Sequence, residues 1–158
     1  MFSIKINNLE QTQELGVYLG KTAQPSNNII LSGDLGAGKT TLTKGIGQGI
    51  GIKQMIKSPT YTIIREYEQG RMPLYHMDVY RVQEGIDELG LDDYFEGNGL
   101  SVIEWGEMLG EELPEDYLKI TIEKIEDTDK RIIYFEPKGK KAQNWYEQIQ
   151  KDWKNENE

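Results

Sequence analysis

Hydrophobic and polar residues alternate along several short segments of the chain, and this spacing predicts β-strands. The alternating segments are Phe2–Ile6, Tyr61–Glu68, Arg71–Asp78, Tyr117–Ile125 and Arg131–Glu136. Short turn-forming stretches separate the second from the third and the fourth from the fifth, so we predict two antiparallel hairpins. Two further segments, Ile29–Ser32 and Leu100–Glu104, are short and mostly apolar. Such runs are typical of strands that are buried on both faces.

Other segments carry apolar residues at helical spacing. Asn8 is a suitable N-cap for a helix that continues to Ala23. Further helices are predicted from Lys39 to about Gly47, with Gly49 and Gly51 ending it, from Ile86 to Phe95, and along the apolar face of Ala142, Trp145, Tyr146, Ile149 and Trp153. Strands mixed with helices predict one α/β domain with a mixed parallel and antiparallel sheet. We assign residues 1–154 to this domain and expect residues 155–158 to be a frayed tail.

Composition narrows the function classes. The chain has 158 residues, no cysteine and a net charge of −9. The missing cysteines exclude disulfides, thiolate zinc sites and a cysteine nucleophile. No apolar run approaches the roughly 20 residues of a membrane span, and the N-terminus lacks the apolar core of a signal peptide, so we expect a cytoplasmic protein without membrane contact. An acidic chain is poorly suited to bind nucleic acid by itself.

The negative charge is concentrated in one segment. Residues 82–116 hold 12 acidic and no basic residues, whereas residues 1–81 have a net charge of +3 and residues 117–158 a net charge of 0. A run of this kind is commonly a solvated face. The alternative is a surface for a partner or a region that faces a metal ion.

The glycines are also clustered, and seven of the 17 lie between Gly33 and Gly51. Within this stretch, residues 33–40 satisfy the pattern G-x-x-x-x-G-K-[ST] and lie between an apolar strand and a helix. Glycines let backbone N–H groups approach phosphates, and the helix N-terminus favours anions. Lys39 would contact the β- and γ-phosphates, and the Thr40 hydroxyl would bind Mg²⁺. The sequence therefore predicts a P-loop NTPase fold.

A P-loop also needs a carboxylate near the metal, at the end of a strand. Glu104 and Asp78 both end predicted strands. We favour Glu104 as the metal ligand and Asp78 as the group that orients the water or nucleophile, although the sequence does not separate these roles. Thr60 is a candidate for a threonine ordered by the γ-phosphate, with a plain Ser-Pro turn as the alternative. His76, the single histidine, is interpreted as structural, and Trp105 is expected near the nucleotide or a partner.

Several P-loop classes can be weighed from motifs alone. The chain lacks the Asn-Lys-x-Asp motif of GTPases, and residues 82–116 have no arginine that could serve in a kinase lid. A small adenine-nucleotide hydrolase or switch remains, with a small-molecule kinase as the alternative and a nucleotide-gated binding switch as a third reading. Arg65, Arg71 and Arg81 are the candidates for an arginine finger within the chain, and a partner is another possible source.

The motifs and their order resemble those of the TsaE family, the bacterial ATPases of the tRNA threonylcarbamoyladenosine pathway. They are residues 33–41 (GDLGAGKTT), 57–62 (KSPTYT), 75–81 (YHMDVYR), 88–90 (ELG) with 93–95 (DYF), and 103–105 (IEW). The resemblance implies an ATPase that binds ATP and Mg²⁺, is slow by itself, and acts with TsaB and TsaD on the adenosine beside the anticodon. Its ATP cycle would reset or regulate that complex, and the tRNA would be bound only through the partners.

The resemblance also assigns residues. It implies ATP contacts from Thr12, Gly36, Ala37, Gly38, Lys39, Thr40, Thr41 and Arg131. Thr40 and Glu104 would be the metal ligands, and Lys39, Asp78 and Thr60 the catalytic residues. Trp105 also matches a functional position. We expect part of the acidic segment, residues 82–116, to face a basic surface of the TsaB–TsaD pair.

Overall fold

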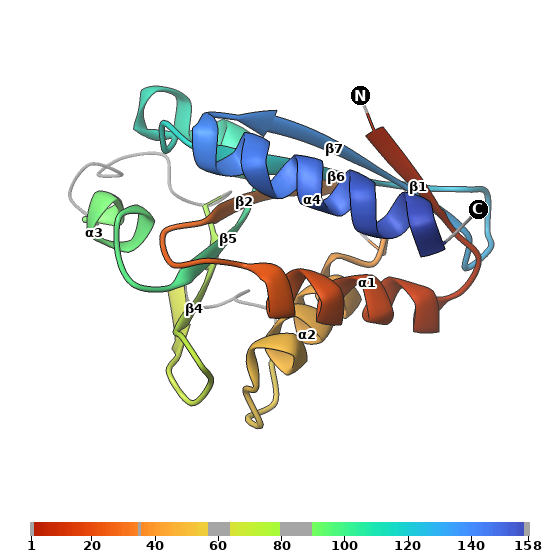
Figure 1. The fold of residues 1–158 in the computed structure, drawn as a ribbon, viewed down its shortest axis with the longest axis horizontal. Helices are drawn as coiled ribbons and strands as arrows, with labels where there is room; N and C mark the ends of the chain where they lie inside the picture. The colour runs from red at the N-terminus through yellow and green to blue at the C-terminus, as the bar shows by residue number, and fades with distance from the viewer. Residues whose placement is uncertain (1, 35, 57–63, 80–89, 157–158) are drawn as a thin grey trace.

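The computed structural model describes residues 2–34, 36–56, 64–79 and 90–156. These described residues form one seven-stranded sheet in the order β1-β7-β6-β2-β5-β4-β3 (Figure 1). The strands are β1 (Phe2–Ile6), β2 (Asn28–Gly33), β3 (Ile64–Tyr67), β4 (Leu74–Asp78), β5 (Leu100–Glu104), β6 (Tyr117–Lys124) and β7 (Arg131–Lys138). The helices are α1 (Leu9–Thr22), α2 (Lys39–Ile50), α3 (Leu91–Phe95), the 3₁₀ helix η2 (Gly106–Glu112) and α4 (Lys140–Glu156). The α/β architecture with a mixed sheet is confirmed.

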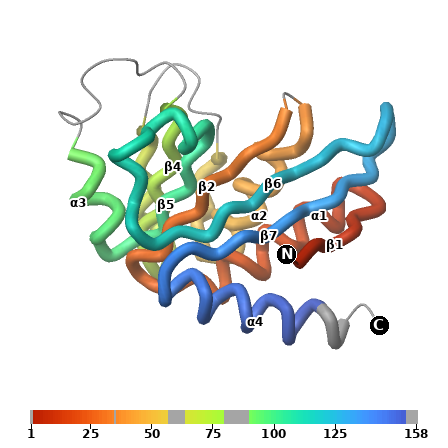
Figure 2. Tube along the Cα trace, turned by 90° about the horizontal axis from the view of Figure 1, so that it is seen from above, coloured from red at the N-terminus to blue at the C-terminus, as the bar shows by residue number. Residues whose placement is uncertain are grey.

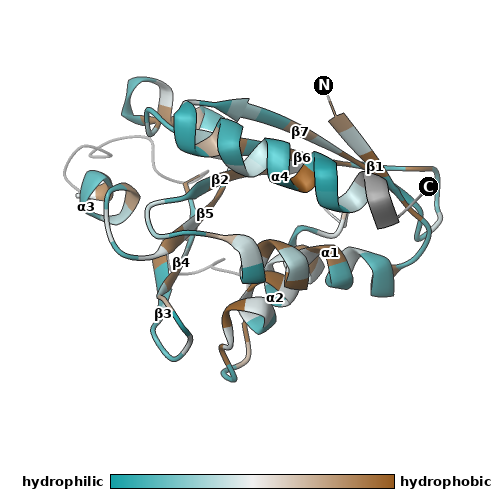
Figure 3. Ribbon diagram, in the orientation of Figure 1, coloured by the Kyte–Doolittle hydropathy of each residue, from teal (hydrophilic) through white to brown (hydrophobic). Residues whose placement is uncertain are grey.

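The central strand β2 is buried on both faces, as its apolar run predicts. Ile29 and Leu31 belong to the larger core, to which α1, α2 and α4 contribute. Ile30 points the other way, into a smaller core that includes Leu91 of α3 and Leu109 of η2. Side chains of a strand alternate between faces, so a strand covered by helices on both sides needs apolar residues at every position. Figure 2 shows α4 alongside β7 and α3 alongside β5, and Figure 3 shows the apolar colouring of β2 and β5.

The direction of the strands brings several candidate functional residues to one edge of the sheet. β4, β5, β2 and β6 run parallel to one another, whereas β3 pairs antiparallel with β4, β7 with β6, and β1 with β7. Asp78 at the end of β4 is therefore level with Glu104 at the end of β5. Gly33, which ends β2 and starts the P-loop, is level with Ile122 near the end of β6. The strand ends, the P-loop and the β6–β7 turn meet at this edge.

Glycines let α1 and α2 pack with their backbones in contact. A Cβ atom on Gly16 of α1 would lie 2.4 Å from the Leu42 carbonyl oxygen, and one on Gly45 of α2 would lie 2.4 Å from the Gln13 carbonyl oxygen. Real Cβ atoms essentially never come so close to another heavy atom. The glycine cluster therefore serves helix packing as well as the P-loop. The expected end of the helix near Gly47 is wrong, since α2 continues to Ile50, but Gly51, one of the two glycines expected to end it, is its C-cap residue.

Other boundaries also differ from the expectation. The helix expected over 86–95 begins at Leu91, after Gly90 with a left-handed φ of 67°, and residues 80–89 lie outside the described residues. The 3₁₀ helix η2 was not predicted. α4 extends to Glu156, and the domain boundary at residue 154 stays a prediction. Within the described residues, no helix is long and apolar enough to cross a membrane.

Candidate nucleotide site

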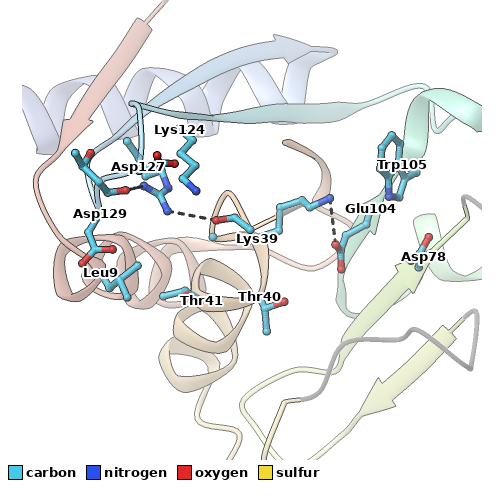
Figure 4. Close-up of a pocket in the computed structure, with 14 residues that line it drawn as sticks. Leu9, Lys39, Thr40, Thr41, Asp78, Glu104, Trp105, Lys124, Asp127 and Asp129 are labelled. Carbon is cyan, nitrogen blue, oxygen red and sulfur yellow. Dashed lines mark hydrogen bonds and ion pairs between the residues drawn. The ribbon is translucent and has the colours of Figure 1, made fainter. Parts of the chain in front are cut away.

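A cavity of about 650 Å³ opens at the edge of the sheet where the P-loop lies. Three groups of residues line it, together with Leu9 at the start of α1. They are the P-loop residues Gly36, Gly38, Lys39, Thr40 and Thr41, the strand-end residues Asp78, Glu104 and Trp105, and the β6–β7 residues Lys124, Asp127, Thr128, Asp129 and Arg131 (Figure 4). Most of the residues that we proposed from the sequence as ligands of the nucleotide and the metal therefore line this cavity.

The P-loop has the backbone that its glycines allow. Gly36 and Gly38 adopt left-handed φ angles of 81° and 112°, which cost residues with a Cβ atom more than glycine. Gly38 is the N-cap residue of α2, and no acidic residue lies in the first turn of that helix. Unpaired N–H groups and the positive end of the helix dipole at such a terminus favour bound anions. The loop can therefore surround a phosphate group.

Lys39 crosses the cavity from the P-loop to the ends of the strands (Figure 4). Its Nζ lies 3.7 Å from Oε1 of Glu104 and 4.9 Å from the centre of the Trp105 ring. Glu104 is only 6% exposed, and a buried carboxylate is stable only when it is paired. This geometry places the P-loop lysine, the candidate metal carboxylate and the tryptophan in one group.

Asp78 and Glu104 lie side by side because their strands are parallel. Their Cα atoms are register partners, and the Val79 N–H donates to the Glu104 carbonyl oxygen at 3.2 Å. Both residues line the cavity. The structure thus brings the two candidate carboxylates to the same site, and the division of roles between them stays a prediction.

His76 contacts the candidate metal carboxylate directly. Its side chain is fully buried, and its Nε2 lies 2.7 Å from Oε2 of Glu104. The sequence showed only a lone histidine on a strand. The contact depends on the parallel pairing of β4 with β5, because this pairing sets His76 two residues behind the level of Glu104.

Arg131 holds the P-loop to the β6–β7 turn. Its Nε donates to the Ala37 carbonyl at 2.5 Å, and Nη2 donates to the Gly36 carbonyl at 3.3 Å. Nη1 donates to the carbonyls of Thr128 and Lys130 at 2.6 and 2.8 Å. Ala37 is itself buried and does not line the cavity. The described contacts of Arg131 are therefore with the backbone that shapes the site.

Four residues that the sequence suggested either lie away from the cavity or fall outside the described residues. Thr12 is fully buried in α1 and does not line the cavity, and its Oγ1 has no hydrogen-bond partner among the described residues. Thr60 and Arg81 lie outside the described residues. Arg71, a candidate arginine finger, does not line the cavity, and its Nη2 donates to three carbonyls at the end of α1, at 2.7, 3.1 and 2.7 Å.

Sequence reasoning missed one wall of the cavity. Leu9, Lys124, Asp127, Thr128 and Asp129 line it, but the sequence suggested only a helix start and a hairpin turn. The parallel pairing of β6 with β2 carries this turn to the P-loop. No pattern in the sequence of the turn itself predicts this pairing of strands.

The donor atoms fit a magnesium ion held together with phosphates. Thr40 and Glu104 supply a hydroxyl and a carboxylate to the same cavity. Magnesium commonly takes one or two carboxylates and completes its shell with phosphate oxygens and water. Among the described residues, no three histidine, aspartate or glutamate side chains cluster so that they could hold a metal ion.

With this geometry in place, comparison with known proteins decides the family. The family model described as "Threonylcarbamoyl adenosine biosynthesis protein TsaE" matches residues 6–133. The chain belongs to the TsaE family. The match spans every strand of the sheet except the greater part of β1 and β7, as well as the whole P-loop.

Individual members of the family show the same likeness. The chain is 45% identical over 127 residues to TsaE of Bacillus subtilis, covering 80% of each chain. It is 42% identical over 127 residues to TsaE of a Nostoc species, covering 77% of this chain and 78% of that one. The crystal structure of Bacillus subtilis YdiB superposes with a TM-score of 0.84 at 39% identity, covering 96% of this chain and 95% of that one. The P-loop NTPase fold predicted from the sequence is confirmed.

Proposed function

We propose that this chain is a Mg²⁺-dependent ATP hydrolase that serves the threonylcarbamoyladenosine modification of tRNA. Membership of the TsaE family supports the pathway. The observation that carries the ATPase activity is the shared cavity, in which P-loop residues face Glu104 and Asp78 across Lys39. A binding loop alone would not need two carboxylates at the strand ends.

The chemistry requires positioning and charge neutralisation more than covalent catalysis. Lys39 and the N–H groups of the loop bind the phosphates, and Asp78 accepts a hydrogen bond from the attacking water and orients it. Thr40 and Glu104 would hold Mg²⁺, which when bound neutralises charge on the phosphate oxygens. Thr60 is the further candidate for orienting the water. An arginine finger would come from Arg65 or Arg81 of this chain or from a partner.

Replacement of Lys39 tests the proposal against a matched control on the same helix. Lys39→Ala should weaken ATP binding by about 100-fold or more, because charge-assisted hydrogen bonds to phosphate are worth roughly 1.5–3 kcal/mol each. Lys44 is exposed on α2, and Lys44→Ala should bind ATP as the wild type does. Calorimetric titration with ATP measures both affinities. Equal affinities of the two variants, or wild-type turnover by Lys39→Ala, would contradict the proposal. Transfer of phosphate to a metabolite and not to water would favour the kinase alternative.

We further propose that the chain acts with TsaB and TsaD and reaches tRNA only through them. The described part of the acidic segment, residues 90–116, contributes carboxylates to two separate cavities. Glu104 lies in the nucleotide cavity, whereas a second cavity of about 480 Å³ near Asn28 is lined by six carboxylate residues and one lysine. They are Asp92, Glu96, Glu111, Glu112, Glu115, Asp116 and Lys141.

The second cavity lies away from the nucleotide site. Asn28 starts β2 and Gly33 ends it, so most of these carboxylates lie at the opposite end of the strand from the P-loop. A surface of one sign favours docking of a partner with the opposite sign. We place the basic surface of the TsaB–TsaD pair against this region.

Gel filtration with purified TsaB and TsaD tests the partner proposal. Complex formation should weaken with added salt and with the double reversal Asp92→Lys and Asp93→Lys, whereas Glu147→Lys on the exposed face of α4 should have little effect. ATP turnover should rise when the partners are added. Failure to form a complex in any nucleotide state would contradict the partner proposal. A complex that neither salt nor the charge reversals weaken would support the alternative interpretation, in which the acidic segment is a solvated face.

A further inference from the structure

His76, the single histidine of the chain, lies directly against Glu104, the candidate metal ligand. His76 and Glu104 lie on adjacent parallel strands, with His76 level with Val102 and Asp78 level with Glu104. The side chain of His76 is fully buried, and that of Glu104 is nearly so. The Nε2–Oε2 distance of 2.7 Å is that of a short, charge-assisted hydrogen bond.

The contacts of the imidazole select one tautomer. A carboxylate accepts hydrogen bonds, so the hydrogen lies on Nε2. Nδ1 is buried and has no hydrogen-bond partner among the described residues. A hydrogen on Nδ1 would be a buried donor without an acceptor, which costs roughly 1–3 kcal/mol. His76 is therefore assigned the Nε2–H tautomer, from its partners.

This hydrogen bond gives the two carboxylate oxygens of Glu104 different partners. Oε2 is taken by His76, and Oε1 faces Lys39 at 3.7 Å. The terminal torsion of a glutamate side chain has no sharp preference of its own, so the orientation of the carboxylate depends on such partners. With His76 in place, one oxygen is directed toward the P-loop and the other away from it.

We propose that His76 is a positioning residue that makes Glu104 a one-oxygen ligand for the ion at the P-loop. The inference rests on the proposed function, because it takes Glu104 as a metal ligand. Hydrogen-bonding partners of metal ligands commonly change metal affinity by about 10–100-fold. His76 would act on the metal through Glu104 and leave the phosphate contacts of the loop unchanged.

Three variants separate this role from a structural one. His76→Leu fills the site without a donor, and His76→Gln keeps a side-chain N–H. Ser101→Ala is the control, because Ser101 is as buried as His76 but its hydroxyl makes no hydrogen bond to any described residue. Electron paramagnetic resonance measures Mn²⁺ binding to each protein with ADP, and calorimetry measures ADP binding in EDTA.

We expect His76→Leu to weaken Mn²⁺ binding by about 10-fold or more, while ADP affinity in EDTA changes by less than about twofold. His76→Gln should recover most of the loss, and Ser101→Ala should match the wild type. Wild-type Mn²⁺ affinity in His76→Leu would overturn the proposal, and so would a loss that Ser101→Ala shares. If the wild type binds neither ADP nor Mn²⁺, the proposed function fails instead.

Nitrogen-15 spectroscopy provides a readout that needs no stable His76 variant. Because the chain has one histidine, its spectrum contains one imidazole. We expect the Nε2–H tautomer in the wild type and a shift of the Nε2 signal in Glu104→Gln. An Nδ1–H tautomer, or an Nε2 signal unchanged by Glu104→Gln, would overturn the contact and with it the positioning role.

Discussion

The packing of α1 on α2 makes a sharp prediction for Gly45→Ala. Gly45 lies on the P-loop helix, and its added methyl group would sit 2.4 Å from the Gln13 carbonyl oxygen of α1. Ordinary van der Waals contact begins at 3.4 Å, so the two helices would have to separate by about 1 Å. Neighbouring contacts are also backbone, with the Gly16 Cα at 3.0 Å, and a backbone cannot turn aside as a flexible side chain can.

Two opposing effects decide the size of the change. Glycine to alanine in a helix interior gains about 1 kcal/mol of helix propensity. Overpacking a tight contact costs about 1–3 kcal/mol or more, and a clash against backbone belongs at the upper end of that range. The expected net loss is about 2 kcal/mol. For a domain of this length, each kcal/mol corresponds to a Tm change of about 2–4 °C, so the Tm should fall by about 4–8 °C.

Gly47→Ala on the same helix is the matched control. Its Cβ would meet the side-chain atoms Cγ1 and Cδ1 of Ile56 at 2.9 and 3.0 Å, and no backbone atom is among its nearest contacts. The propensity gain is the same, so we expect a change within about 1 kcal/mol of zero. Thermal unfolding followed by circular dichroism measures both variants. A Gly45→Ala protein as stable as Gly47→Ala would refute the reasoning that backbone contact between α1 and α2 requires glycine.

Three further predictions concern the site and its surroundings. Arg131→Lys should weaken ATP binding by about 10-fold in calorimetry, because one ammonium group cannot reproduce four carbonyl contacts to the P-loop and the turn; unchanged affinity would contradict this role. ATP should alter the fluorescence of Trp105, since Lys39 has to leave the ring to reach the phosphates, and Trp105→Phe should remove the change. Burial first, and then the charge and hydrogen bond of Glu66, raise the pKa of Tyr94 above its usual value of 10.0. The protonated Tyr94 side chain therefore contributes to stability fully below pH 10, and this contribution is lost as the pH rises through the raised pKa. Glu66→Gln should lower this pKa in a tyrosinate absorbance titration, and an unchanged pKa would contradict the contact.

Residue patterns were sufficient for the elements that depend on local spacing. The apolar run of β5 was predicted to its last residue, and so was the alternation of β1. The Asn8 cap of α1 was also correct, since the Asn8 side chain accepts a hydrogen bond from the Gln11 N–H. Each of these features arises from contacts between residues close in sequence, or from the difference between a buried and an exposed face.

The P-loop is local in the same sense. Its glycines, Lys39 and Thr40 follow one another along the chain, and a strand before them and a helix after them suffice to form the anion site. The sequence alone therefore determined the fold class, the P-loop and the likeness to the TsaE family. It also indicated two carboxylates at strand ends, Glu104 and Asp78, but it did not show how they lie relative to each other.

The tertiary structure decided how distant segments meet. Parallel pairing of β4 with β5 sets Asp78 beside Glu104 and brings His76 against its carboxylate, and pairing of β6 with β2 carries Arg131 to the P-loop. It also placed carboxylates of residues 90–116, the described part of the acidic segment, in two separate cavities and showed that Gly45 lies in the contact between α1 and α2. The physical reason is common to all of these: strand order and helix approach are set by burial of the whole core, which no short stretch of sequence encodes.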